Sequence, residues 1–171
     1  MENCGELCTF TLLNKSLSQM DRFIGNIDAK ADAKGRVFIP AIFRKILNEI
    51  GEDCFILRKD IYQACLILYP FQSWNEELDK LRLKLNKWNP DHQALYRQFL
   101  LDSEKLEMEP NGRILIPKRY LQMTGITSDV RFIGMDNTIE IWNRSNLEES
   151  LLLPEEFERG IRQFLGGLAD E

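Results

Sequence analysis

Two short segments of the chain carry the same order of polar and apolar positions. Residues 32–40 read Asp-Ala-Lys-Gly-Arg-Val-Phe-Ile-Pro, and residues 109–117 read Glu-Pro-Asn-Gly-Arg-Ile-Leu-Ile-Pro. Glycine after a polar residue predicts a tight turn, the apolar triplet predicts a short strand, and proline suits the first position of a helix. Because such self-similarity marks a duplicated unit, we expect two tandem repeats, at 20–78 and 103–151, joined by a helical insert at 79–102.

The pattern after each proline predicts the same succession of elements in both repeats. A helix that ends at a glycine is followed by two strands rich in β-branched and aromatic residues. The expected helices span 41–50 and 118–124, and the expected strands span 54–58, 64–69, 130–134 and 138–142. A closing helix begins near Ser73 or Ser145, each followed three positions later by glutamate, as in a capping box. The fold class is therefore α+β, with peripheral helices.

Apolar stripes at helical spacing predict helices outside the repeats as well. Two of them, over 76–86 and 91–101, form the insert, and a third follows Pro154 in the acidic C-terminal segment 152–171. The apolar face of this third helix consists of Phe157, Ile161, Phe164, Leu165 and Leu168. Residues 1–19 match neither repeat, and we expect a disordered leader or an extension upstream of a natural start at Met20.

The acidic residues are concentrated at the C-terminus. The formal net charge is −5, from 22 basic and 27 acidic residues. Residues 146–171 alone carry −5, so residues 1–145 are neutral as a whole. A neutral body does not bind a polyanion strongly through bulk charge. If nucleic acid is the ligand, several copies of a small basic site must act together.

Several classes of protein are excluded by the sequence. No apolar run approaches the ~18–20 residues of a membrane-spanning helix, and acids stand where a signal peptide has positive charge, so we expect a cytoplasmic protein. Its four cysteines are then reduced thiols, and a single histidine offers no zinc ligand set. Motifs for nucleophilic, phosphate-binding, dinucleotide-binding or zinc-protease sites are absent. We therefore expect no enzyme, cofactor, metal or small-molecule substrate.

The two Gly-Arg turns are the constellation that recurs. Turn residues project into solvent, and a hairpin with arginine and lysine can enter a major groove or follow phosphates. The candidate DNA-binding residues are Lys30, Lys34 and Arg36 in the first repeat, and Asn111, Arg113 and Arg119 in the second. The residues expected to shape the turns and orient the arginines are Asp32, Gly35, Glu109 and Gly112. Alternatively the turns are purely structural, each acid pairing with its own arginine.

Together with Ile39-Pro40, and with Leu66-Ile67-Leu68-Tyr69-Pro70 running to Trp74, these turns resemble the MraZ family of bacterial regulators of the division and cell-wall gene cluster. The resemblance covers about 20–165, and the second motif departs from it by having Glu109 where the family has Asp. It implies a swapped-hairpin, AbrB-like β-barrel formed by two pseudo-symmetric halves.

The resemblance also implies a function. Members of this family form ring-shaped homo-oligomers that bind short direct repeats of double-stranded DNA upstream of the gene cluster. Their DNA-contact motif falls on residues 32–36 and 109–113 of this chain. We therefore expect a nucleoid-associated transcriptional repressor. The alternative is a ring-forming assembly or adaptor protein whose turns are structural. RNA binding is disfavoured, since no aromatic-rich strand motif of the stacking type is present.

Overall fold

The computed structural model of the chain describes residues 22–166. The first repeat comprises β1 (Phe23–Lys30), β2 (Arg36–Phe38), α2 (Ala41–Ile50), β3 (Cys54–Lys59), β4 (Cys65–Pro70) and α3 (Phe71–Lys84). The second comprises β5 (Ser103–Glu107), β6 (Arg113–Leu115), α5 (Lys118–Thr124), β7 (Asp129–Asp136), β8 (Thr138–Asn143) and α6 (Arg144–Ser150). Helix α4 (Pro90–Leu101) lies between them, and α7 (Pro154–Leu165) follows the second repeat. The expected leader at 1–19 lies outside the described residues.

The two repeats exchange their first strands. β1 pairs antiparallel with β7 of the second repeat, from Phe23 opposite Asp136 to Lys30 opposite Asp129. β5 pairs with β3 of the first repeat, and β4 pairs with β8 across the centre of the sheet. The six strands therefore run in the order β1-β7-β8-β4-β3-β5. Each edge strand therefore pairs with a strand of the opposite repeat, so neither repeat forms its half of the sheet alone.

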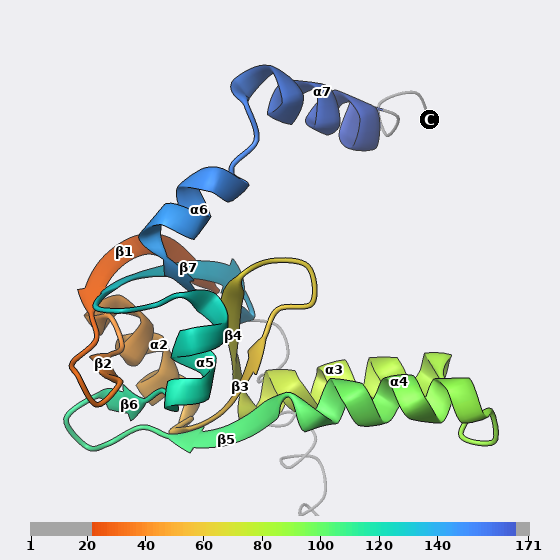
Figure 1. Cartoon of the computed structure of the whole chain (residues 1–171), viewed down its shortest axis with the longest axis horizontal. Helices are drawn as coiled ribbons and strands as arrows, with labels where there is room; N and C mark the ends of the chain where they lie inside the picture. Colours follow the sequence, from red (N-terminus) through yellow and green to blue (C-terminus); the bar gives the residue numbers. More distant parts are fainter. Residues whose placement is uncertain (1–21, 167–171) are drawn as a thin grey trace, which may run out of the picture.

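The mixed α+β class is confirmed, but the closed barrel is not. Among residues 22–166 no strand pair joins β1 to β5, so the six-stranded sheet is open. A separate two-stranded ribbon, formed by β2 and β6, lies between these edges instead (Figure 1). Its central residues, Val37 and Ile114, are fully buried against the sheet. The ribbon thus covers the core where a closed barrel would need the edge strands to pair.

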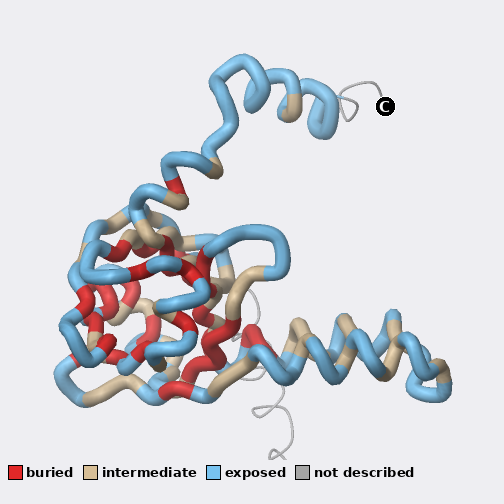
Figure 2. Tube along the Cα trace, viewed as in Figure 1, coloured by how far each residue is buried: buried red, intermediate tan, exposed pale blue. Residues whose placement is uncertain are grey.

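One hydrophobic core serves both repeats. Its largest fully buried side chains include Phe43 of α2 and Tyr120 of α5, together with Phe23, Phe55 and Phe132 of the sheet. Burying a phenylalanine side chain stabilises a fold by about 1.5–3 kcal/mol, so this shared cluster holds the two repeats together. The buried residues gather in the body of the molecule (Figure 2).

Helices α2 and α5 occupy the predicted residues, but the closing helices begin earlier than predicted. α3 begins at Phe71, directly after Pro70, which has no capping side chain. α6 begins at Arg144, where the side chain of Asn143 accepts a hydrogen bond from the Ser145 amide. The predicted serine caps are therefore wrong. In α3 the fixed φ of Pro70 suits the residue before the helix, and in α6 an asparagine oxygen supplies the cap.

Two helical arms project from the body. α3 and α4 form an antiparallel hairpin on one side, and α6 leads to α7 on another (Figure 1). Both arms are mostly exposed, in contrast to the body (Figure 2). Within residues 22–166 no helix is both long and apolar enough to cross a membrane.

Candidate nucleic-acid interface

The first Gly-Arg turn is closed by Asp32. One carboxylate oxygen of Asp32 accepts hydrogen bonds from the backbone amides of Lys34 (2.9 Å) and Arg36 (3.0 Å). The other accepts from Nε of Arg36 at 2.7 Å. These bonds, first among them that from the Arg36 amide, lower the pKa of Asp32 to about 2. The carboxylate therefore fixes both the turn and the direction of the arginine.

The second turn reaches the same shape with different side chains. Nε of Arg113 donates to Glu109 at 3.2 Å, so the acid–arginine pair is retained. The backbone amide of Arg113, however, donates to the side chain of Asn111 at 3.1 Å. Asn111 in turn donates to Glu109 at 3.2 Å. The longer glutamate keeps the arginine, and the asparagine takes over the backbone contact that Asp32 makes in the first turn.

Strands β2 and β6 bring the two turns together. Arg36 lies opposite Leu115 and Phe38 lies opposite Arg113 in the antiparallel register. Because side chains alternate along a strand, these four residues share the outward face, whereas Val37 and Ile114 point into the core. Phe38 is 52 % exposed and Leu115 is 49 % exposed. We call this face, formed by Arg36, Phe38, Arg113 and Leu115, the arginine ribbon.

The arginine ribbon combines two kinds of contact. The guanidinium carbon of Arg113 lies 5.5 Å from the centre of the Phe38 ring, so a cation and an aromatic side chain are neighbours on it. Arginine can donate to guanine edges and to phosphate oxygens, and apolar side chains can contact the methyl group of thymine. A two-stranded ribbon also has the width that a major groove admits.

The remaining predicted residues are distributed differently. Lys34 is exposed at the tip of the first turn. Arg119 of α5 donates to Glu104 at 2.5 Å and to the Tyr120 hydroxyl at 3.0 Å, so it is bound to β5. Lys30 ends β1 opposite Asp129. The structure therefore joins Arg36 and Arg113 in one ribbon, and leaves Lys30 and Arg119 outside it.

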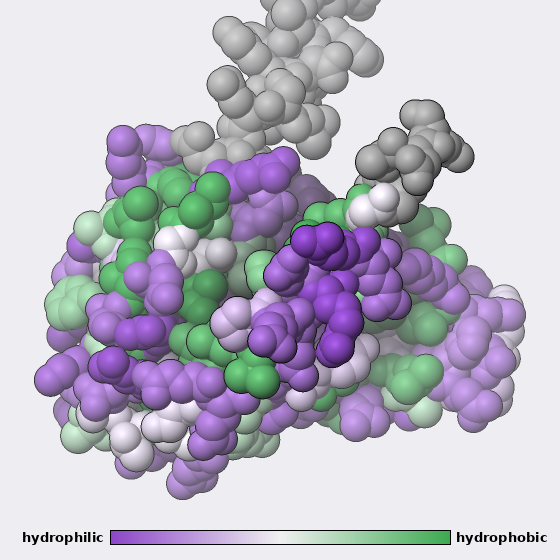
Figure 3. All heavy atoms as spheres, turned by 90° about the horizontal axis from the view of Figure 1, so that it is seen from above, coloured by the Kyte–Doolittle hydropathy of each residue, from purple (hydrophilic) through white to green (hydrophobic). Residues whose placement is uncertain are grey.

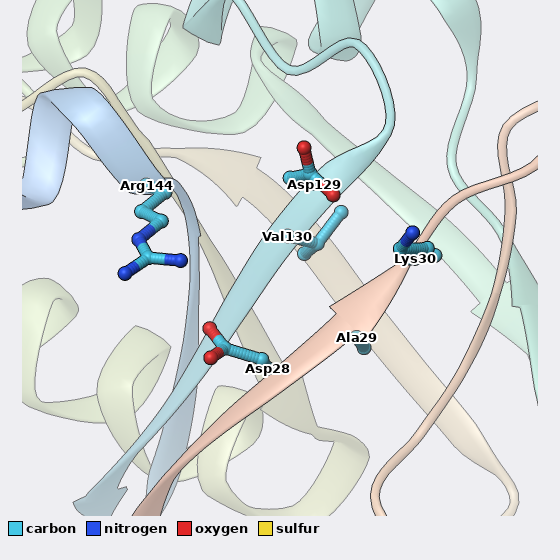
Figure 4. Close-up of a pocket in the computed structure, with 6 residues that line it drawn as sticks. All are labelled: Asp28, Ala29, Lys30, Asp129, Val130 and Arg144. Atoms are coloured by element: carbon cyan, nitrogen blue, oxygen red, sulfur yellow. The ribbon is translucent and has the colours of Figure 1, made fainter.

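Lys30 borders a surface depression of about 320 Å³ (Figure 4). Its charged lining residues are Asp28, Lys30, Asp129 and Arg144, so positive and negative groups are balanced. Asp28 is also held by two hydrogen bonds from Arg131, which lower its pKa. A balanced lining does not favour an anionic ligand, and the depression adds nothing to the arginine ribbon.

Sequence reasoning missed three residues of the interface. It treated 37–39 and 114–116 as uniformly apolar strands, although alternation in a strand places Phe38 and Leu115 on the outward face. It did not single out Arg44, which lies in α2. Arg44 packs against the second turn, since a Cβ atom added to Gly112 would lie 2.4 Å from its Cδ. Its Nε is buried without a hydrogen-bond partner in residues 22–166.

Cys54, Cys65 and His92 have structural environments with no sign of catalytic or metal-binding chemistry, and Cys4 and Cys8 lie outside the described residues. Burial raises the pKa of the Cys65 thiol to about 12, so this thiol is protonated near neutral pH. Burial also raises the pKa of Cys54, which is only partly buried. Nδ1 of His92 accepts from the Asn86 amide at 2.9 Å in the turn between α3 and α4. In the described part of the chain no three His, Cys, Asp or Glu residues gather as a metal site.

Comparison with known proteins agrees with this architecture. Residues 23–98 and 99–152 each match the family model described as "MraZ protein, putative antitoxin-like". The chain is 59 % identical to the transcriptional regulator MraZ of Bacteroides fragilis, over 85 % of this chain and 92 % of that protein. It is 55 % identical to that of Bacteroides thetaiotaomicron and 52 % identical to that of Phocaeicola vulgatus, in each case over 85 % of this chain and 94 % of the relative.

The chain therefore belongs to the MraZ family, as the turn motifs predict. The names of these relatives are those of transcriptional regulators and not of enzymes, which agrees with the expectation from the sequence.

Proposed function

We propose that this protein is a transcriptional regulator that binds double-stranded DNA through the arginine ribbon. In this proposal it is a nucleoid-associated repressor of the division and cell-wall gene cluster, and it binds short direct repeats upstream of that cluster as a ring-shaped homo-oligomer. The observation that carries the proposal is the outward face of β2 and β6, where two oriented arginines alternate with two exposed apolar side chains. The names of the relatives support the regulatory role.

The net charge of the chain supports the proposal that several copies of the arginine ribbon bind DNA together. One ribbon has two arginines, whereas the chain as a whole has a formal charge of −5. Specific DNA binding at physiological salt usually needs several phosphate contacts in addition to base contacts. A closed ring of identical subunits multiplies such contacts without new chemistry. Direct repeats in the DNA match the repeated orientation of subunits in a ring.

The two arginines have unequal numbers of available donors. Within residues 22–166, Arg36 contacts Asp32 through Nε alone, at 2.7 Å. Arg113 uses Nε at 3.2 Å and Nη2 at 3.1 Å toward Glu109. A guanidinium has five N–H donors, so Arg36 keeps a complete pair of terminal nitrogens for a base edge. We therefore assign base recognition to Arg36, and phosphate contact to Arg113 and Lys34.

A direct test is DNA binding by fluorescence anisotropy, with a duplex that contains the direct repeats upstream of the gene cluster. We expect Arg36→Ala to lose at least tenfold in affinity for this duplex and much of its preference over scrambled DNA. Arg113→Ala should lose affinity for both duplexes alike. The slope of log affinity against log salt should fall by about 0.9 for each phosphate contact removed.

Arg144→Ala is the matched control. Arg144 also pairs with an acid four residues away, Glu148, at 3.2 Å, but it lies on α6 outside the ribbon. This variant should bind DNA as the unchanged protein does. Unchanged affinity in Arg36→Ala, with a normal melting curve, would reject the ribbon as the DNA-binding surface.

The second candidate is a ring-forming assembly or adaptor protein with structural turns. One observation favours it: both arginines are already paired with carboxylates of their own turns. Such a protein would retain no DNA even at low salt. Its Arg36→Ala variant would lose stability, whereas neither it nor the unchanged protein would bind DNA, so melting curves and DNA binding together separate the candidates.

A further inference from the structure

The C-terminal helix α7 presents an apolar face that nothing in its own subunit covers. Four apolar residues lie one above another on it, at i, i+4, i+7 and i+8: Phe157, Ile161, Phe164 and Leu165. All four are exposed, Phe157 to 59 % and Phe164 to 77 %. The preceding residues, Leu151 to Leu153, are exposed as well. Apolar side chains reach the surface beside hydrophilic ones on this side of the molecule, where α7 is nearest to the viewer (Figure 3).

The other helical arm carries a groove of suitable chemistry. The groove has a volume of about 470 Å³ and lies between the β3–β4 loop and helices α3 and α4. Its apolar lining residues are Ile61, Leu81, Leu85, Leu95 and Phe99. Arg58 also lines it, 3.9 Å above the Phe99 ring, and is only 5 % exposed. Nε of Arg58 is buried without a hydrogen-bond partner in residues 22–166.

The segments that carry the two surfaces differ in charge, while the groove lining itself holds Arg58 and Lys59 together with Asp60 and Asp102. Residues 148–158 contain five glutamates and no basic residue. Residues 80–97, which form the distal part of the α3–α4 hairpin, contain five basic residues and one acid, Asp91. Opposite charge in these segments would orient an incoming α7, with its acidic N-terminal end next to the basic hairpin.

We infer that α7 of one subunit lies in the α3–α4 groove of a second copy of this chain. The apolar face at i, i+4 and i+7 is the pattern of a helix that binds in a groove. α7 has 12 residues and is about 18 Å long. Helix and groove are different surfaces of one molecule, so the contact is head-to-tail and can close into a ring. The inference thus specifies the contact between subunits in the assembly proposed above, and it rests on that proposal for the ring.

The first experiment measures the mass of the particle by light scattering after size-exclusion chromatography. Phe157→Asp on α7 and Leu95→Asp in the groove should each reduce the mass, while circular dichroism stays unchanged because both side chains are exposed. Gln163→Asp is the matched control, since it adds the same charge to the opposite face of α7 and should leave the mass unchanged.

Mixing distinguishes a second copy from the same chain. An equimolar mixture of the Phe157→Asp and Leu95→Asp proteins retains one intact groove and one intact helix, on different chains. We expect a mixed dimer that neither variant forms alone. No gain in mass on mixing would overturn the inference.

Zero-length cross-linking provides a readout that does not require dissociation. A carbodiimide joins lysine to glutamate, and Lys84 and Lys87 of the hairpin should join Glu155 or Glu156 of α7. With subunits of two isotopic compositions, a mixed-isotope cross-link supports the inference, whereas same-chain products alone, or no such product, contradict it. If the mass and cross-links of the variants equal those of the unchanged protein, the proposed contact between α7 and the groove is wrong, while the proposed ring is not rejected. Loss of DNA binding is measured separately with Arg36→Ala.

Discussion

The two turn glycines provide a stringent test of the interface, because they share a conformation and differ in their neighbours. Gly35 has φ of +90° and Gly112 has φ of +86°. Alanine at either position meets the same backbone strain, about 1–2 kcal/mol for a positive φ. The difference between the two variants therefore reports what each added methyl group contacts.

At Gly35 the new Cβ would lie 2.4 Å from the backbone oxygen of Ile116. That strand cannot retreat freely, since the Ile116 amide donates to the Gly35 oxygen at 2.9 Å. Breaking this bond adds about 1–2 kcal/mol, so with the backbone strain we expect Gly35→Ala to lose about 2–4 kcal/mol in total. At Gly112 the new Cβ would lie 2.4 Å from Cδ of Arg44. Arg44 is a flexible side chain whose Nε has no partner to lose among the described residues, so we expect only the strain, about 1–2 kcal/mol.

The assay is urea denaturation of both variants at one fixed protein concentration, because the proposed assembly would make apparent stability concentration-dependent. The free energies of unfolding should differ by about 1–2 kcal/mol, which corresponds to roughly 2–8 °C in melting temperature for a chain of this size. Equal losses, or a larger loss for Gly112→Ala, would refute the inference that β6 is a rigid partner of the first turn and that Arg44 is a movable one.

Three further predictions follow from single groups. The pKa of Asp32 is lowered from 3.8 to about 2. Its contribution to stability is therefore present above pH 4 and lost as the pH falls toward 2, and Asp32→Asn should flatten unfolding free energy against pH in that window. Cys65 should resist iodoacetamide at pH 8 in the folded protein and react once urea unfolds it, because burial raises its pKa to about 12; rapid native labelling would contradict its placement. The Tyr120 hydroxyl donates to the Asp102 carbonyl at 3.0 Å, so Tyr120→Phe should lose about 1 kcal/mol of unfolding free energy, and an unchanged denaturation midpoint would argue against that bond.

Local signals predicted the helices and the turns but not the pairing of the strands. Gly51 and Gly125 end α2 and α5 where the pattern places them, because a left-handed residue at a helix end is specified by one position. The same is true of the acid–arginine pairs, which span four residues in each turn. Interactions between residues so close in the sequence can be predicted from the local pattern.

The exchange of β1 and β5 had no comparable signal. β1 pairs with β7, about one hundred residues away, as in the contact of Asp28 with Arg131. β5 reads Ser-Glu-Lys-Leu-Glu, and only Leu106 of it is buried. An edge strand with one exposed side resembles a loop in sequence, so its partner is fixed only when the whole core assembles. The open sheet could not be predicted for the same reason. The family resemblance implies a barrel, but no local signal in the sequence shows whether the two edge strands pair with each other.

The paired carboxylates do not by themselves argue against DNA binding by the arginines. An unpaired arginine on a surface samples many rotamers, and binding must then order it at a cost of about 0.5–1.5 kcal/mol. Asp32 holds Nε of Arg36 at 2.7 Å and does not engage its terminal nitrogens, and the strand that carries Arg36 is paired with β6. Hydrogen bonds from Arg36 lower the pKa of this carboxylate to about 2, so it stays ionised well into the acidic range. The negative charge of Asp32 weakens the attraction of Arg36 to phosphate. The hydrogen bond between them holds Arg36 in place for contact with a base. A single arginine ribbon of this kind would bind DNA weakly but would discriminate well between sequences. Repetition of the ribbon in the proposed ring would then supply the affinity that one copy lacks.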